Sequence, residues 1–187
     1  MTKSIKLTYF PIKARGEPIR LALSIAGLDF EDERLTKEQF VAIKETLPFK
    51  QLPVLTVDGR TYAQSNAILR YIGKLDGKLY PQDAEEALSI DQILDHVEDI
   101  HKKIYPSLWE KDAVKKMELR KELVENTFPE LFSMLEALPR YAANHVKQEV
   151  LVYIIITLFL VSFNCRACAL PTLQLARIGD SRRHSIW

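Results

Sequence analysis

The segment LTYFPIKARGEP, residues 7–18, holds the first residue with clear chemical potential. Tyr9 ends a run of alternating apolar and polar residues, which is typical of a strand, and a basic loop then leads into a helix. A tyrosine hydroxyl can donate a hydrogen bond to an anion, and the helix N-terminus near Arg15 adds a dipole that also favours negative charge. Taken alone, however, a strand tyrosine most often packs its ring into a core.

Two further segments are candidates for binding the polar groups of a ligand. Leu52 and Pro53 begin an apolar run, where the proline either opens an edge strand or shapes a binding turn. Gln64 and Ser65 precede an amphipathic helix. Ser65 is predicted to be its N-cap, at a position that favours carboxylates.

The overall composition excludes several function classes. The 187 residues are 47% hydrophobic and 27% charged, which indicates a folded chain with one large or two small domains. The formal net charge of +1 argues against nucleic acid or an anionic membrane as a partner. Residues 1–80 carry 13 basic and 9 acidic side chains, whereas residues 81–146 carry 8 and 14. The basic first part favours an anionic ligand, although a single surface lysine, such as Lys44 or Lys50, is usually just solvated.

The two cysteines, Cys165 and Cys168, form the pattern C-x-x-C. A redox pair needs a strand that leads into a helix, and a zinc site needs two further ligands, but His145 and His184 lack ligand spacing. We therefore expect an accidental pair and no metal. Two cysteines also exclude a disulfide framework. Because no apolar signal segment follows the N-terminus, the sequence predicts a cytoplasmic protein.

The first 80 residues alternate between strand and helix patterns. Strands are predicted over 5–9, 30–35, 53–57 and 61–63, with the hairpin signal Asp58-Gly59 between the last two. Helices are predicted over 18–26, 37–46 and 65–75. This β-α-β-α-β-β-α order predicts an α/β thioredoxin-like domain with a mixed four-stranded sheet and helices on both faces.

A helical part is predicted after the first domain. Residues 81–86 form a polar linker, and apolar residues spaced by three and four predict a long helix over 87–109, then a second over 115–138. The second domain is therefore an all-α helical hairpin over 87–144, followed by an atypical tail over 145–187. The apolar run at 150–163 is short for a membrane span and suits a buried segment better.

These segments in this order resemble the cytosolic glutathione transferases, and among them the tyrosine-type, sigma-like class. The resemblance rests on the start TYF…RG, on KQLPVL, on QSNAILRYI and on the helical second domain, and it covers residues 4–145. It implies an enzyme that conjugates the thiolate of its co-substrate glutathione to hydrophobic electrophiles, as a homodimer and without a metal. Some sigma-like relatives isomerise a prostaglandin endoperoxide or reduce peroxides with the same thiolate, and the sequence does not choose between these activities.

Tyr9 matches the family's catalytic tyrosine, and the free energy needed to ionise a thiol shows whether one such hydroxyl is enough. A free thiol titrates near ~8.5, so a mostly ionised thiol at neutral pH needs a shift of about 2 units, or roughly 2.7 kcal/mol. A hydrogen bond to a charged group contributes on the order of 1.5–3 kcal/mol. One well-aimed hydroxyl therefore supplies most of the shift.

The resemblance also assigns the contacts to glutathione. Arg15 and Phe10 lie beside the tyrosine, and Lys44 and Gln51 match contacts to the glycyl end, with Lys50 nearby. The peptide bond before Pro53 is cis in the family, which lets the backbone of Leu52 pair with the cysteinyl part as a short added strand. Gln64 and Ser65 hold the γ-glutamyl end.

At Phe40 the relatives usually have a tryptophan whose indole N–H donates to the glycine carboxylate. Phenylalanine cannot donate, so glutathione binding is expected to be weaker by on the order of 1 kcal/mol. By the same resemblance, Asp99 reaches the active site of the partner subunit, although it could equally be one surface acid among many. The electrophile is expected between two apolar or aromatic groups of residues: Tyr9, Phe10 and Ile12, and Ile104, Tyr105 and Leu108.

The chain departs from the family after about residue 144, where the relatives continue with a buried helix that a Ser/Thr-x-x-Asp segment introduces. We expect an incomplete helical domain and a foreign end from about 145, such as the product of an altered transcript. This departure keeps two alternatives open. One is a non-catalytic glutathione-transferase-like binding or structural protein, and the other is a membrane-associated form that uses the run at 150–163.

Overall fold

The computed structural model describes residues 3–137. The first part of the chain has nine elements in this order: β1 (Ile5–Tyr9), η1 (Ala14–Gly16), α1 (Glu17–Ile25), β2 (Glu31–Arg34), α2 (Lys37–Ile43), η2 (Lys44–Thr46), β3 (Val54–Val57), β4 (Arg60–Ala63) and α3 (Ser65–Asp76). The second part has α4 (Ala84–Trp109), α5 (Ala113–Glu122), the π-helical turn η3 (Leu123–Thr127) and α6 (Phe128–Ala137). The predictions for residues 138–187, including the apolar run and the cysteine pair, lie outside the described residues.

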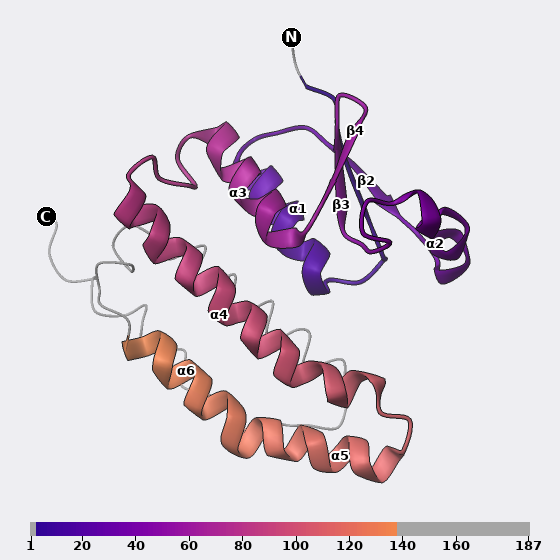
Figure 1. The fold of residues 1–187 in the computed structure, drawn as a ribbon, viewed down its shortest axis with the longest axis vertical. Coiled ribbons are helices and arrows are strands. Elements are labelled where there is room, and N and C mark those ends of the chain that lie inside the picture. Colours follow the sequence, from indigo (N-terminus) through magenta and orange to yellow (C-terminus); the bar gives the residue numbers. More distant parts are fainter. Residues whose placement is uncertain (1–2, 138–187) are drawn as a thin grey trace, which may run out of the picture.

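The four strands form one mixed sheet in the order β2-β1-β3-β4. β1 pairs with β2 in parallel and with β3 antiparallel, and β3 pairs with β4 antiparallel. Asp58 and Gly59 have φ of 48° and 81°, as the predicted two-residue hairpin turn requires. Figure 1 shows α1 and α3 together on one side of the sheet and α2 on the other, so the thioredoxin-like fold predicted from the sequence is confirmed.

The core of the first part lies between the sheet and the helix pair α1 and α3. Its buried members are apolar residues of β1, β3 and the two helices: Ile5, Leu7, Leu55, Val57, Ile19, Leu23, Ile68 and Ile72. Tyr9 continues the row of Ile5 and Leu7, since every second residue of a strand faces the same side of the sheet. The ring of Tyr9 therefore points toward α1 and not away from it.

The face of α1 differs from the sequence pattern. Ile25 is half exposed, whereas the charged Arg20 is buried beside Ile19 and Leu23. Arg20 is tolerated there because its guanidinium group has polar partners in the adjacent loop and strand.

The helical part begins earlier than predicted. α4 starts at Ala84 because the Asp83 carboxylate accepts hydrogen bonds from the amides of Glu85 and Glu86, so the helix takes up half of the predicted linker. Asp112 caps α5 in the same way, so α5 begins at Ala113, two residues before the predicted start at 115. Figure 1 shows α5 and α6 running back alongside α4, as a helical hairpin requires. Within residues 3–137, no helix is both long and apolar enough to cross a membrane.

Candidate functional site

A cleft of about 780 Å³ opens where the C-terminal end of β1 and the N-terminus of α3 face α4. Its size is typical of a small-molecule site. Eleven of the twelve residues that the sequence singles out for glutathione line this cleft: Tyr9, Phe10, Arg15, Phe40, Lys44, Lys50, Gln51, Leu52, Pro53, Gln64 and Ser65. Residues from four separate segments of the chain thus meet at one place.

Tyr9 lies at the inner wall of the cleft and is only 5% exposed. Burial raises the pKa of its hydroxyl, and the main-chain N–H and the charge of Arg15 oppose this effect without cancelling it. The hydroxyl therefore keeps its proton at neutral pH and can act as a hydrogen-bond donor. The main-chain N–H of Arg15 can only donate a hydrogen bond, so it meets a lone pair of the Tyr9 hydroxyl oxygen. The phenolic proton of Tyr9 is therefore available for a ligand.

Gly16 packs directly against the ring of Tyr9. A Cβ atom at Gly16 would lie 2.3 Å from Cδ1 and 2.8 Å from Cγ of that ring, well inside van der Waals contact. Gly16 has φ −80° and ψ −29°, values that any residue adopts, so the glycine is needed for space and not for backbone freedom. The turn η1 thereby sets how far the ring reaches toward the cleft.

Arg15 joins the first part of the chain to α4. Its Nε donates to the hydroxyl of Tyr105 at 2.6 Å, and its Nη2 donates to the carboxylate of Glu98 at 2.6 Å. Nη1 lies 3.4 Å from Oγ of Ser65. Burial disfavours the charge on Glu98, but the hydrogen bond from Arg15 and the positive charge of Arg15 together outweigh burial and hold the pKa of Glu98 below its usual value. The pair is therefore charged at neutral pH and fixes the position of Arg15 beside Tyr9.

The segment before β3 and the start of α3 form the opposite wall. The peptide bond between Leu52 and Pro53 is cis, as the resemblance to the transferases implies. The prediction that Ser65 caps α3 is wrong, because Gln64 occupies the N-cap position without a side-chain cap and Ser65 is the first helical residue. Ser65, as the first residue of α3, still lines the cleft, and a helix N-terminus favours anions.

Backbone strain is concentrated around the cleft. Ala14, Lys50 and Gln64 have φ of 32°, 53° and 74°, and all three line it. Residues other than glycine rarely adopt this left-handed region, and such strain often occurs at ligand-binding sites. The backbone at the rim is therefore held in place by its surroundings.

The two lysines and Phe40 form the outer rim. Lys44 is exposed at the start of η2, and Lys50 pairs with Glu45 at 2.5 Å. The ring of Phe40 meets the ring of Phe10 edge to face, with 5.4 Å between centroids. The rim thus combines two cations with an aromatic edge, which suits an anionic peptide.

Two predicted residues lie outside the cleft. The Asp99 side chain is 63% exposed and accepts a hydrogen bond from Lys102 at 2.9 Å, whereas its neighbour Glu98 lines the cleft. Ile104 is 2% exposed and packs in the core, so it is not part of the expected electrophile wall. Tyr105 and Leu108 do line the cleft, because α4 turns them to the same side as Glu98.

His101 is a cleft residue that sequence reasoning missed. Its side chain is 10% exposed, and its ring stacks on that of Tyr105 with 6.5 Å between centroids. Nδ1 lies 3.8 Å from Glu98, beyond hydrogen-bonding distance, and neither ring nitrogen has a hydrogen-bond partner. Burial, aided by the charge of Arg15, lowers the pKa of His101 to about 4. The one sequence signal for the burial of His101 is its position one helical turn after the apolar Val97.

We expect His101 to make stability pH-dependent. The unfolded chain takes up a proton near pH 6.5, whereas the folded chain does so only near pH 4. The free energy of unfolding should therefore fall as the pH falls from 6.5 toward 4, by up to about 3 kcal/mol. Urea unfolding of the full chain and of His101→Gln across this range measures the difference in slope. Equal slopes for His101→Gln and the unaltered chain would contradict the assignment.

Within residues 3–137, no group of three or more His, Cys, Asp or Glu side chains is arranged to hold a metal ion. The cleft offers hydrogen-bond donors, cations and a helix N-terminus, which are groups that bind and stabilise anions.

Comparisons with known proteins agree with this geometry. The family model "Glutathione S-transferase, N-terminal domain" matches residues 5–74. A glutathione S-transferase of Anopheles gambiae is 37% identical over 141 residues, which cover 75% of this chain and 69% of the relative. The chain spans about half the length of several other curated relatives that it matches.

Solved structures give the same result. A sigma class glutathione transferase of Fasciola hepatica superposes with a TM-score of 0.72 at 30% identity, covering 87% of this chain and 82% of that one. The prostaglandin synthase D of Nilaparvata lugens superposes with a TM-score of 0.66 at 41% identity, covering 70% and 65%.

Proposed function

Because this chain belongs to the glutathione S-transferase family, we propose that its cleft binds glutathione and that Tyr9 stabilises the thiolate. The observation that carries the proposal is the state of Tyr9: a buried hydroxyl, kept protonated, at the wall of a cleft whose rim is basic. A protonated phenol donates to a thiolate sulfur, and this stabilises the charged form of the thiol over the neutral form.

The reaction proposed is nucleophilic attack by sulfur. The glutathione thiol loses its proton to solvent, and the hydroxyl of Tyr9 donates a hydrogen bond to the thiolate. The sulfur then forms a bond to an electrophilic carbon, and the leaving group departs with its electron pair. Phe10, Ile12, Tyr105 and Leu108 supply the apolar wall against which such an electrophile packs.

The binding of glutathione is proposed to follow the three parts of the peptide. The amides at the start of α3, with Gln64 and Ser65, hold the γ-glutamyl carboxylate. The backbone of Leu52 pairs with the cysteinyl part, and Gln51 and Lys44 lie at the glycyl end. Arg15 acts indirectly, since its guanidinium group is already engaged by Glu98 and Tyr105.

A homodimer is part of the proposal. Asp99 lies exposed on α4 and does not line the cleft of its own chain. Its carboxylate is therefore accessible to a second copy of the chain. In this arrangement Asp99 pairs with the amino group of glutathione in the partner's cleft.

The test of the proposed function uses the full chain. Retention on immobilised glutathione, together with conjugation of a chlorinated aromatic substrate, is the expected result. Retention without turnover would instead favour the non-catalytic binding protein, and the absence of both would contradict the proposal.

A second candidate activity is isomerisation by the same thiolate. The observation that favours it is the similarity to the prostaglandin synthase D of Nilaparvata lugens. Incubation with a prostaglandin endoperoxide and product analysis separates this activity from conjugation, since an isomerase consumes no glutathione.

Replacing Phe40 by tryptophan should tighten glutathione binding. The indole adds an N–H donor at the rim, and one added hydrogen bond of about 1 kcal/mol lowers the Kd about five-fold. Calorimetric titration with glutathione measures the change. Phe40→Leu is the matched control without a donor, and equal affinities of the two variants would show that the indole N–H has no carboxylate within reach.

A further inference from the structure

Arg20 is a buried cation at the base of the loop that follows Tyr9. Its side chain is 9% exposed, and the residue stands among the apolar members of α1. An arginine at such a site needs partners for its five N–H groups, because unpaired buried donors are costly. The identity of those partners shows what Arg20 holds together.

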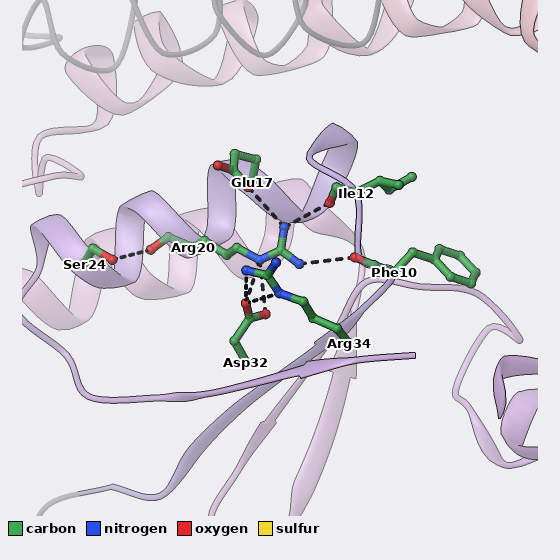
Figure 2. Close-up of polar contacts among 7 residues, drawn as sticks. All are labelled: Phe10, Ile12, Glu17, Arg20, Ser24, Asp32 and Arg34. Atoms are coloured by element: carbon green, nitrogen blue, oxygen red, sulfur yellow. Dashed lines mark hydrogen bonds and ion pairs between the residues drawn. The ribbon is translucent and has the colours of Figure 1, made fainter. Parts of the chain in front are cut away.

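Figure 2 shows the guanidinium group of Arg20 between α1, β2 and the loop. Its Nη1 donates to the carbonyl of Ile12 at 3.0 Å, and its Nη2 donates to the carbonyl of Phe10 at 3.3 Å. Nε donates to both carboxylate oxygens of Asp32 at 3.1 Å, and Nη1 also donates to Glu17 at 3.1 Å. One side chain therefore ties two carbonyls of the loop to the sheet and to the start of α1.

The two bonded loop residues are those that face the cleft. Phe10 and Ile12 both line it, and Figure 2 shows their side chains directed away from the guanidinium group that holds their carbonyls. The guanidinium carbon also lies 5.9 Å from the centroid of the Tyr9 ring. Gly16 packs against the same ring and leaves it no room to shift. Tyr9 is therefore positioned by its contact with Gly16 and by Arg20, which fixes the loop that follows it.

Resting on the function proposed above, we infer that Arg20 is a positioning residue of the active site. It fixes the Phe10–Ile12 loop, and thereby both the electrophile wall and the place of the Tyr9 hydroxyl. Arg20 itself touches no reacting atom. None of the described hydrogen bonds joins the Arg20 side chain to the residues of the opposite wall that are proposed to bind glutathione. Its partners all lie on α1, β2 and the loop.

The variant Arg20→Met tests this inference in the full chain. The KM for the electrophile should rise and kcat should fall, each by about ten-fold, as two charge-assisted bonds to the loop are lost. The Kd for glutathione should change by less than about two-fold, because its proposed contacts lie on the opposite wall, apart from that of Tyr9 to the sulfur. General damage to the fold would weaken glutathione binding as well.

Arg34→Met is the matched control. Arg34 also donates to the Asp32 carboxylate, at 2.7 Å, but it is 55% exposed and no hydrogen bond of its side chain to the loop is described. This variant removes a guanidinium group from the same carboxylate and should keep both kinetic constants. Equal kinetic losses in Arg20→Met and Arg34→Met would overturn the inference, because the charge balance of Asp32 would then explain both.

A second measurement needs no activity. Lys13 is exposed directly after the Phe10–Ile12 loop, and trypsin cleavage after it in the native state should be about ten-fold faster in Arg20→Met than in Arg34→Met or the unaltered chain. An inactive unaltered chain would contradict the proposed function, yet this measurement would still test the loop contact. Unchanged cleavage would overturn the inference.

Arg20→Lys keeps the test decisive if Arg20→Met does not fold. Lysine retains the charge between Asp32 and Glu17 but lacks the planar fork that reaches both carbonyls. Cleavage after Lys13 and the KM for the electrophile should then lie between the values of the unaltered chain and the ten-fold changes above. Values equal to those of the unaltered chain would show that a single positive charge is sufficient and that Arg20 does not position the loop.

Discussion

Phenylalanine in place of Tyr9 is expected to lower kcat for conjugation by about 10- to 150-fold. The lost hydrogen bond to the thiolate is worth on the order of 1.5–3 kcal/mol, which gives this range of rates. The ring can stay packed beside Gly16, since only the hydroxyl is removed. Glutathione affinity should change little, because the other proposed contacts remain. Steady-state kinetics with a chlorinated aromatic substrate, combined with calorimetric binding of glutathione, measure both effects.

Tyr62→Phe is the matched control for this substitution. Tyr62 is 50% exposed on β4 and does not line the cleft, so its hydroxyl should have no effect on kcat. A Tyr9→Phe enzyme with the kcat of the unaltered chain would refute catalysis by the tyrosine, whatever the result for Tyr62.

The second large effect is expected for Gly16→Ala. The added methyl group would overlap the Tyr9 ring at 2.3 Å, so the ring or the turn η1 must move. We expect kcat to fall at least ten-fold, toward the value of Tyr9→Phe, because the hydroxyl no longer meets the sulfur. The overlap should also cost about 1–3 kcal/mol of the free energy of unfolding.

Gly77→Ala is the control that separates a loss of stability from a loss of kcat. Gly77 ends α3 with a φ of 71°, and an alanine there meets no atom within 4 Å but strains the backbone. It should therefore lose about 1 kcal/mol of stability without a loss of kcat. Chemical unfolding and kinetics of both variants are the measurement. A Gly16→Ala enzyme that is destabilised yet fully active would show that the close contact does not position the ring.

The elements of the first domain could be predicted because their signals are local. Asp58-Gly59 marks a hairpin by the backbone angles that it needs. The structure adds a second local signal at the start of α2, where Thr36 forms a capping box with Gln39. Alternation along β1 placed Tyr9 in line with Leu7. The alternation of helices and strands predicted a mixed four-stranded sheet, although the order of its strands is known only from the structure.

Contacts between distant segments could not be predicted in the same way. Arg20 interrupts an apolar helical face, and only the loop carbonyls and Asp32 explain its burial. Glu98 and Asp99 are neighbours of like charge, so the sequence cannot tell which one α4 turns toward Arg15. His101 is likewise buried by the packing of α4 and not by any local pattern.

The candidate cleft combines residues that could be predicted from motifs with contacts that could not. Most of its residues were named from motifs that the resemblance carries, and the structure brings them together around one cavity. The support for Tyr9, by contrast, comes from Gly16, Arg15 and Arg20, whose roles depend on distances that only the folded chain has.

The ionisation of glutathione in the complex tests directly whether Tyr9 stabilises the thiolate. Titration of the thiolate absorbance of bound glutathione, in the unaltered chain and in Tyr9→Phe, gives the pKa of the sulfur in each complex. We expect the thiol bound to the unaltered chain to titrate about 2 units below the ~8.5 of a free thiol, and Tyr9→Phe to remove at least about 1 unit of this shift. The same thiol pKa in both complexes, or a value near that of free glutathione in the unaltered chain, would contradict this role of Tyr9.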